Sequence, residues 1–280
     1  MRYDYTSIGF ITFDCLMRPF TAVPPGGGTI FIPELTLAVS GAAGSAVVAA
    51  AKYGLRCLAV GGVGRDDMGD WVLGKLAAFG IDTSTMQRCE GFSTSSSIVL
   101  TRADGSRPAL HMQGATGGFE IGAAMLDQVL DAGVIHIGGT GLMHRMDGEP
   151  SFRLFAEARR RGRTTTLDVF AATRDDMRLV AGLLPNTDYF MPSIEEARAL
   201  SGLTDVADTA KFFLDSGVRC CVLTLGGDGA YYHHRNGDRF LMPGFAVDVV
   251  CTCGCGDVFN AGIATAIVKG LDPESMVRLA

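Results

Sequence analysis

Apolar positions follow two alternating patterns along most of the chain. Short runs of apolar and β-branched residues predict strands at Ser7–Phe13, Cys57–Gly61, Val134–Ile137, Thr164–Leu167, Tyr189–Met191 and Cys220–Thr224. Longer segments with apolar residues three and four positions apart predict helices at Ala46–Tyr53, Met68–Phe79, Ser151–Arg161, Ile194–Ser201 and Asp205–Ser216. Strands that alternate with helices form βαβ units. We therefore expect an α/β fold whose mainly parallel sheet is covered by helices on both faces.

Two regions interrupt this alternation. The segment 15–38 carries "VPPGGG" between two β-like stretches, and the segment 94–112 is typical of a hairpin around "ADGSR". Both predict antiparallel strands outside the main sheet, which we interpret as a small β lid. No linker and no internal repeat divides the chain, so we expect residues 1–280 to form a single domain with that lid.

The last residues, "DPESMVRLA", predict the start of a helix. Asp272 is a good N-cap residue and Pro273 suits the first helical position, yet the sequence stops two turns later. We therefore expect the chain to be cut short at this end.

Composition and charge exclude several classes of protein. The formal net charge is −6, which argues against nucleic acid or an anionic membrane as the main partner. The N-terminal residues do not resemble a signal peptide, and the apolar stretch 35–51 is too short and too rich in small residues to span a membrane. Eight cysteines are scattered through apolar segments, so we expect reduced thiols and a cytoplasmic location.

The stretch "VVCTCGCGDVFNAG", residues 249–262, contains glycines of the kind that bind phosphate. It does not match a P-loop, because no G-x-x-x-x-G-K-[ST] string occurs in the chain. A dinucleotide fingerprint requires a third glycine where Phe259 stands, and it opens a helix early in its domain. A Rossmann dehydrogenase is therefore disfavoured.

A third interpretation fits this stretch better. Gly254, Cys255 and Gly256 precede a helix-like segment, so their backbone N–H groups are expected to converge on an anion at the positive end of the helix. Asp257 would repel a phosphate there unless it accepts a proton from an attacking hydroxyl group. An anion hole beside a base is what phosphoryl transfer to an alcohol requires. The structural alternative is that Asp257 only caps the helix and the glycines form a turn.

The three cysteines of the same stretch suggest a metal site at first sight. Their C-x-C-x-C spacing lacks the C-x₂-C pairs of structural zinc sites, and no histidine lies nearby. We therefore interpret the thiols as small packing groups in a tight loop.

The string "TCGCGDVFNAG" resembles the C-terminal signature of the ribokinase-like (PfkB) family of carbohydrate kinases, whose core is G-[AC]-G-D-x-F. Further segments resemble family motifs in the right order, and together they cover essentially the whole chain: "FITFD", "SGAAGSAVVAAAKYG", "GGVGRDDMGDWVLGKLAAFGID", "MPSIEEA" and "LTLGGDGAYY". The resemblance implies a Rossmann-like α/β/α sandwich with a β-sheet lid. It also implies that the protein uses ATP and Mg²⁺ to phosphorylate a hydroxymethyl group.

The resemblance also implies roles for individual residues. Asp257 would be the catalytic base, with the N–H groups of Gly254, Cys255 and Gly256 as the anion hole, and Glu196 would organise Mg²⁺. The remaining sites divide into an ATP group and a substrate group. The ATP group is Ser193, Thr224, Gly226, Gly229 and Thr252; the substrate group is Asp14, Gly41 and Ser45.

The chain departs from the family pattern at four places. Ser45 and Ser193 each stand where the family has asparagine, which shortens the polar reach at the substrate and metal sites. Cys251 stands where the family has aspartate, which weakens the case for the monovalent cation (K⁺) that many relatives bind nearby. Relatives also continue past residue 280 with a helix that helps to enclose adenine.

The acceptor stays open at this point between a sugar and a nucleoside, since the motifs are shared by kinases for both. A non-catalytic nucleotide- or sugar-binding member of the fold is a further alternative, although retention of Asp257 and Glu196 argues against it. Arg107 and His111, in the predicted lid, either reach the substrate or lie on the lid surface. Exposed lid strands favour association, so a homodimer through the lid is also predicted.

Overall fold

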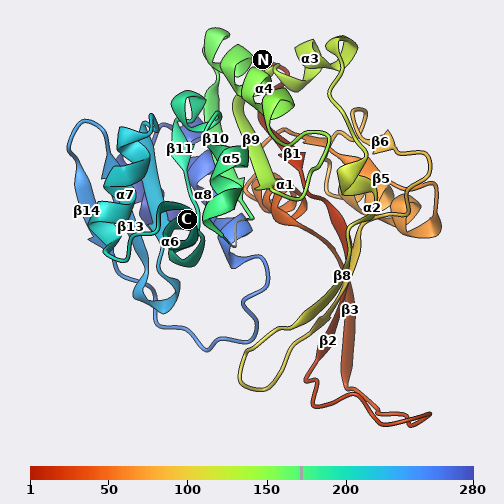
Figure 1. The fold of residues 1–280 in the computed structure, drawn as a ribbon. Helices are drawn as coiled ribbons and strands as arrows, with labels where there is room; N and C mark the ends of the chain where they lie inside the picture. The colour runs from red at the N-terminus through yellow and green to blue at the C-terminus, as the bar shows by residue number, and fades with distance from the viewer. Residues whose placement is uncertain (171–172) are drawn as a thin grey trace.

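The computed structural model describes residues 1–170 and 173–280, and its body is built on one large sheet (Figure 1). The strands of this sheet are β1 (Tyr3–Gly9), β4 (Cys57–Val60), β9 (Ala132–Thr140), β10 (Thr164–Val169), β11 (Tyr189–Phe190), β12 (Cys220–Thr224), β13 (Ala230–His234) and β14 (Arg239–Met242). Their order is β14-β13-β12-β11-β10-β9-β1-β4. All neighbouring strands from β12 to β4 are parallel, whereas β13 is antiparallel to both of its neighbours, β12 and β14. The mainly parallel α/β class is thereby confirmed.

Helices connect these strands and include all five that the sequence predicts. They are α1 (Ala42–Lys52), α2 (Asp67–Ala78), α3 (Ala123–Val129), α4 (Glu149–Arg160), α5 (Met177–Val180), α6 (Ile194–Ser201), α7 (Val206–Asp215), α8 (Cys255–Lys269) and α9 (Pro273–Leu279). Short 3₁₀ turns are η1 (Gly114–Gly117), η2 (Arg174–Asp176), η3 (Leu184–Asn186) and η4 (Gly226–Asp228). In the described part of the chain, no helix has both the length and the apolar character needed to span a membrane.

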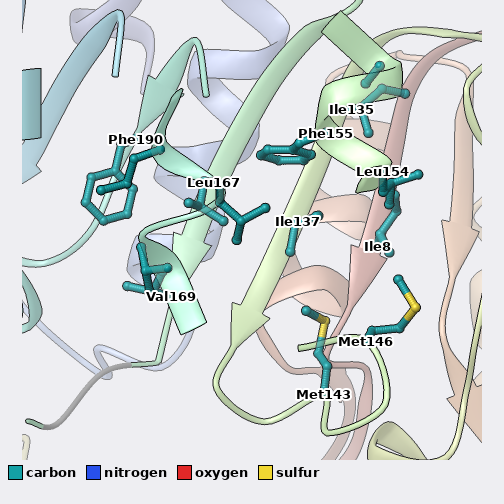
Figure 2. Packing of buried hydrophobic residues seen from close by; sticks show 14 of the residues in the cluster. Ile8, Ile135, Ile137, Met143, Met146, Leu154, Phe155, Leu167, Val169 and Phe190 are labelled. Atoms are coloured by element: carbon teal, nitrogen blue, oxygen red, sulfur yellow. The ribbon is translucent and has the colours of Figure 1, made fainter. Parts of the chain in front are cut away.

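The helices divide between the two faces of the large sheet. Side chains of α4, α6 and α7 pack into one apolar cluster, and those of α1, α2, α8 and α9 pack on the opposite side. Ile8, Ile137 and Leu167 are neighbours on β1, β9 and β10 and meet Phe155 of α4 on the first side (Figure 2). Because side chains alternate along a strand, the intervening residues of these strands point to the second side.

A separate four-stranded sheet extends away from the body at the end where α1 begins (Figure 1). Its strands, in spatial order, are β3 (Glu34–Ser40), β2 (Thr12–Arg18), β7 (Ser96–Leu100) and β8 (Ala109–Met112). The outer pairs are antiparallel, while β2 and β7 are parallel to each other. A two-stranded sheet pairs β5 (Gly62–Val63) with β6 (Gln87–Arg88) and lies near α2 (Figure 1).

The predicted strand Ser7–Phe13 is wrong in one respect, because it is divided between the two sheets. β1 ends at Gly9 and β2 begins at Thr12, so the chain leaves the large sheet between them. Gly9 has a φ of 133°, and a Cβ atom there would lie 2.2 Å from the carbonyl oxygen of Gly138. The continuous apolar run hides this close contact, which only glycine tolerates.

Candidate active site

The N-terminus of α8 presents free backbone donors. Gly254 is the N-cap residue, with a left-handed φ of 71° that favours glycine. In the described residues, the N–H groups of Gly254 and Gly256 have no protein acceptor, and that of Cys255 makes only a long 3.4 Å bond to the Thr252 carbonyl. A Cβ atom at Gly256 would meet nothing within 4 Å, so this face of the turn is open. The turn therefore has the donors that an anion requires.

Asp257 stands in the first turn of α8, beside these donors. A Cβ atom at Gly254 would lie 3.5 Å from Asp257 Oδ2 and 3.5 Å from Ser45 Oγ, so the carboxylate and the hydroxyl both flank this glycine. Burial raises the pKa of Asp257 above its ordinary value, and the charge of Asp14 adds to the increase. The Ser45 hydroxyl and the positive charge of Arg107 oppose the increase. A carboxylate with a raised pKa suits a general base.

The three residues predicted to hold substrate lie where β2 and α1 begin. Asp14 is buried and accepts a 2.7 Å hydrogen bond from the Thr12 hydroxyl. Gly41, the N-cap of α1, has a φ of 81°, and a Cβ atom there would lie 2.5 Å from the Phe10 carbonyl oxygen. That carbonyl accepts the N–H groups of the first turn of α1, which fixes the helix start beside Asp14. The structure thus brings Asp14 and Ser45 close to Asp257.

Two further carboxylates lie near Asp257 at the carboxyl ends of the strands. Burial raises the pKa of Asp168, at the end of β10, well above its usual range, and the charges of Glu196 and Asp257 add to this. Burial likewise raises the pKa of Glu196. The Asn260 amide lies close enough to Asp168 to lower its pKa, yet among the described residues its side-chain atoms make no hydrogen bond of normal geometry. Neighbouring carboxylates raise one another's pKa, and a cation bound among them would stabilise their ionised forms.

Asp168 and Asn260 were not predicted as site residues from the sequence. A signal was available for Asp168, because it directly follows the predicted strand Thr164–Leu167, and ligands of open parallel sheets bind at the carboxyl ends of the strands. Asn260 lies one helical turn after Asp257, a spacing that places both on one side of α8.

Ser193 and Glu196 form a capping box at the start of α6. The Ser193 hydroxyl donates to Glu196 Oε2 at 2.8 Å, and the Ser193 N–H donates to the same oxygen at 3.0 Å. Glu196 therefore has a structural partner besides any metal. Ser193 also forms a bridge to Thr224 at the end of β12, so two of the predicted ATP residues are adjacent.

The other predicted ATP residues follow β12. Gly226 has a φ of 59° and faces open space, whereas a Cβ atom at Gly229 would lie 2.0 Å from the Met242 carbonyl oxygen. Glycine is required at position 229 because β14 packs closely against the backbone there, whereas Gly226 borders open space. These residues follow β12, whereas Asp14 follows β1 on the other side of β9 and β10, the two strands against which α8 packs.

Arg107 comes from the hairpin between β7 and β8 and reaches the loop before α8. Its Nε donates a 2.9 Å hydrogen bond to the hydroxyl of Thr252. The sequence left two positions open for Arg107, at the substrate or on the surface of the lid. In the structure its side chain contacts a residue of the candidate site, Thr252. His111 packs edge-on against Phe10 with ring centroids 5.2 Å apart, and its Nδ1 lies 3.1 Å from the Ser97 hydroxyl. It lies on the face of the small sheet that carries Asp14.

The donor atoms present fit some metals and not others. The oxygens of Asp168, Glu196 and Asn260 suit a hard cation such as Mg²⁺. Within residues 1–170 and 173–280, no group of three or more histidine, cysteine or acidic side chains is arranged to hold a metal by itself, so water and phosphate oxygens would have to complete the shell. The thiol of Cys251 is too soft a ligand to replace a carboxylate for K⁺, so this position does not fit a monovalent cation.

Comparison with known proteins gives matches over nearly all of the chain. The family model of the pfkB family carbohydrate kinases matches residues 11–280. A 2-dehydro-3-deoxygluconokinase of Bacillus subtilis is 24% identical over 90% of this chain and 81% of its own length. A ribokinase of Haemophilus influenzae is 25% identical over 99% and 90%, respectively.

Solved structures show the same fold. Arabidopsis thaliana ribokinase complexed with ribose and ATP has a TM-score of 0.83 at 19% identity, covering 99% of this chain and 90% of that one. A putative ribokinase II from E. coli in complex with ATP and Mg²⁺ has a TM-score of 0.83 at 21% identity, covering 98% and 89%. The ribokinase-like architecture predicted from the sequence is confirmed.

Proposed function

The chain belongs to the pfkB family of carbohydrate kinases, and on this premise we propose that it transfers the γ-phosphoryl group of ATP to a hydroxymethyl group of a sugar or sugar-like substrate. The observation that carries the proposal is the position of Asp257. Its carboxylate lies beside Gly254, whose N–H and that of Gly256 have no protein acceptor in the described residues. A base and an anion hole in one helical turn can together remove a proton from the attacking hydroxyl group and stabilise the phosphoryl group that it attacks.

In that step, Asp257 accepts the proton of the substrate hydroxyl as its oxygen bonds to the γ-phosphorus. The bond between this phosphorus and the bridging oxygen of ATP breaks, and ADP leaves. The N–H groups of Gly254 and Gly256 stabilise the charge on the phosphoryl oxygens during transfer. Asp14 orients the substrate through charge-assisted hydrogen bonds to its hydroxyls, with Gly41 and Ser45 beside it.

Mg²⁺ fits the cluster of Asp168, Glu196 and Asn260 near the same turn, and when bound it neutralises phosphate charge. Glu196 would hold the ion through water, because one of its oxygens already caps α6. Ser193, Thr224, Gly226 and Gly229 would hold ATP on the β12 side, and Thr252 would contribute from the loop before α8.

Arg107 supports this proposal from the small sheet, which would act as a lid. Its hydrogen bond to Thr252 brings a permanent positive charge to the loop before α8, and this charge lowers the pKa of Asp257. A cation placed here stabilises negative charge at the point of transfer. A closed lid would also exclude water, which competes with the substrate for the phosphoryl group.

A nucleoside acceptor is a second candidate, favoured by one observation. A pocket of about 440 Å³ begins at Ser45 and Gly254 and extends between α1 and the small sheet. Its walls are largely apolar, including Leu16, Val48 and Val258. A nucleoside could place its sugar at Asp257 and its flat base between the apolar walls of this pocket.

The direct experiment measures ADP release with ATP and Mg²⁺ over a panel of pentoses, hexoses, ketodeoxy acids and nucleosides. The matched blank is Asp257→Asn, which preserves size and removes the base. We expect release with at least one acceptor, and release that is at least about 100-fold slower with Asp257→Asn. Equal rates in both proteins would contradict the assignment, and tight ATP binding without turnover would favour a non-catalytic role.

The small sheet also supports the predicted homodimer. Leu37, Ile98 and Leu110 lie in one cross-strand row on one face, with Cys15 between the first two, and they are 40–66% exposed. The other face carries Asp14 and His111. An apolar face of this kind is complementary to a second copy of itself. Light scattering of wild type and Leu110→Asp tests it, since a dimeric wild type and a monomeric variant are expected, and a monomeric wild type would contradict it.

A further inference from the structure

Two cysteines before α8 lie in a setting unlike that of the others. Cys251 Sγ accepts a 3.3 Å hydrogen bond from the Cys253 N–H, so its side chain folds back over Thr252 towards Cys253. The hydroxyl of Thr101, just after β7, lies 3.8 Å from the same sulfur. The Cys253 N–H thus donates to this sulfur and the Thr101 hydroxyl lies beside it, and polar neighbours of this kind favour the ionised form of a thiol.

A permanent positive charge lies over the same loop. Arg107 Nε donates to the hydroxyl of Thr252, the residue between the two cysteines, at 2.9 Å. Burial alone would raise the pKa of Cys251, but the Cys253 thiol and amide, the Thr101 hydroxyl and the charge of Arg107 together lower it. Burial and the neighbouring Cys251 raise the pKa of Cys253. One sulfur of the pair is thus prepared as a nucleophile and the other stays protonated beside it.

The remaining cysteines provide an internal contrast. Cys57, Cys220 and Cys221 are buried in apolar clusters, where burial raises the pKa of each thiol. Cys255 is the exposed one in the same loop. Reactivity governed by exposure would select Cys255, whereas reactivity governed by the local charges would select Cys251.

We propose that Cys251 is a site of reversible thiol oxidation, at which low-molecular-weight disulfides of the glutathione class act as the oxidant and Cys253 resolves the product. The Cys251 thiolate attacks one sulfur of the small disulfide, forming a mixed disulfide and releasing one thiolate. Cys253 then loses its proton to solvent and attacks the Cys251 sulfur. The mixed S–S bond breaks, a second small thiolate leaves, and a Cys251–Cys253 disulfide remains. Two protein thiols are oxidised and one small disulfide is reduced to two thiols.

The product would close a small ring around Thr252. It would replace the hydrogen bond from the Cys253 N–H to Cys251 and constrain the residue that holds Arg107. Gly254 follows immediately, so its N–H group would shift with the loop. This consequence rests on the proposed function, and it makes phosphoryl transfer sensitive to the thiol–disulfide balance.

The test first maps the chemistry without measuring kinase activity. The full chain is incubated with oxidised glutathione, free thiols are alkylated, and trypsin releases residues 240–269, which hold all three cysteines of the loop. We expect this peptide to lose two hydrogen atoms and to carry the alkyl group only on Cys255. Cys253→Ser should stop at the glutathione adduct on Cys251, and Cys255→Ser, the matched control, should still form the disulfide. Arg107→Gln should slow the reaction several-fold.

Preferential modification of Cys255 in wild type, with Cys251 alkylated, would overturn the proposal even if the variants fold poorly. The second arm follows ATP-dependent phosphorylation during oxidation and after dithiothreitol. We expect activity to fall as the disulfide forms and to return on reduction, while Cys251→Ser keeps its own activity under oxidant. A disulfide without an effect on activity would overturn the regulatory consequence. A protein that phosphorylates no acceptor before oxidation would instead contradict the proposed function and leave the thiol mapping intact.

Discussion

At one level of the large sheet, three central strands carry opposite chemistry on their two faces. Towards α4, the neighbouring residues of β1, β9 and β10 are Ile8, Ile137 and Leu167. One residue earlier on each strand, the neighbours are Ser7, His136 and Thr166, which point towards α1 and α8. Both sets are fully buried. Burial of the apolar residues stabilises the folded state, whereas burial of the polar residues contributes less because their groups lose water.

The polar face lies beneath the candidate site. Ser7 donates to the Ala43 carbonyl at the start of α1, and His136 Nδ1 lies 3.0 Å from the Thr166 hydroxyl. Two residues after Thr166, β10 carries Asp168. The helix starts around Asp257 therefore lie over a row of buried polar side chains, whereas the stability of the fold depends on the apolar face. Substitutions on the two sides should therefore fail in different ways.

The largest expected effect is on the polar side. Asp257→Asn should lower kcat by about 10²–10⁴-fold, because the proton acceptor is lost, while ATP affinity and thermal stability stay close to wild type. Steady-state kinetics and calorimetric titration of ATP measure the two separately. Turnover within a few-fold of wild type would remove the base assignment.

The next effect is on the apolar side. Phe155→Ala removes a fully buried ring that packs against Ile137 and Leu167, and it should lower the free energy of unfolding by ~3–5 kcal/mol. Arg153→Ala is the matched control, since this exposed side chain on the same helix is expected to change stability by less than about 0.5 kcal/mol. Urea unfolding measures both, and equal stabilities would contradict the contrast between the faces.

A smaller effect is expected from the small sheet. Arg107→Ala should lower kcat by ~10–100-fold through loss of the positive charge beside Thr252. Arg102 lies on the same hairpin, and its side chain donates a hydrogen bond to the nearby Ser106 hydroxyl. Arg102→Ala should therefore change kcat less than about twofold. Similar losses in the two variants would show that the hairpin, and not the charge at Thr252, is what matters.

The smallest effect is a shift in pH dependence. Activity requires ionised Asp257, whose pKa is raised, so kcat/KM should fall as pH drops through that raised value. Ser45→Ala removes a hydroxyl that lowers this pKa, so the acid limb should move to higher pH, with a change near neutrality below about tenfold. A shift of the acid limb to lower pH would contradict the interaction between Ser45 and Asp257. Because folding raises the pKa of Asp257, its ionisation at neutral pH lowers the stability of the folded state. The ionised base that the reaction requires is therefore destabilising.

Local patterns predicted the helices, the parallel strands and the glycine turn before α8, because each depends on residues close together in sequence. Three features depend on distant contacts and were not predictable in this way. The division of Ser7–Phe13 depends on Gly138, and the carboxylate cluster joins Asp168 to Glu196 across two strands. The strands β13 and β14 carry polar and aromatic residues at an antiparallel edge, where the βαβ rhythm gives no guide.

The position of β1 in the large sheet has a consequence for how the chain folds during synthesis. This first strand pairs with β4 on one side and with β9 on the other, so Tyr3 meets Ala132. This strand, which is almost entirely buried in the folded protein, must therefore wait for the synthesis of almost half of the 280 residues before its second neighbour exists. Non-local pairing of this kind slows folding and leaves an exposed strand edge in the meantime. A nascent chain stalled before β9 should accordingly bind holdase chaperones, and one extended past β9 should release them.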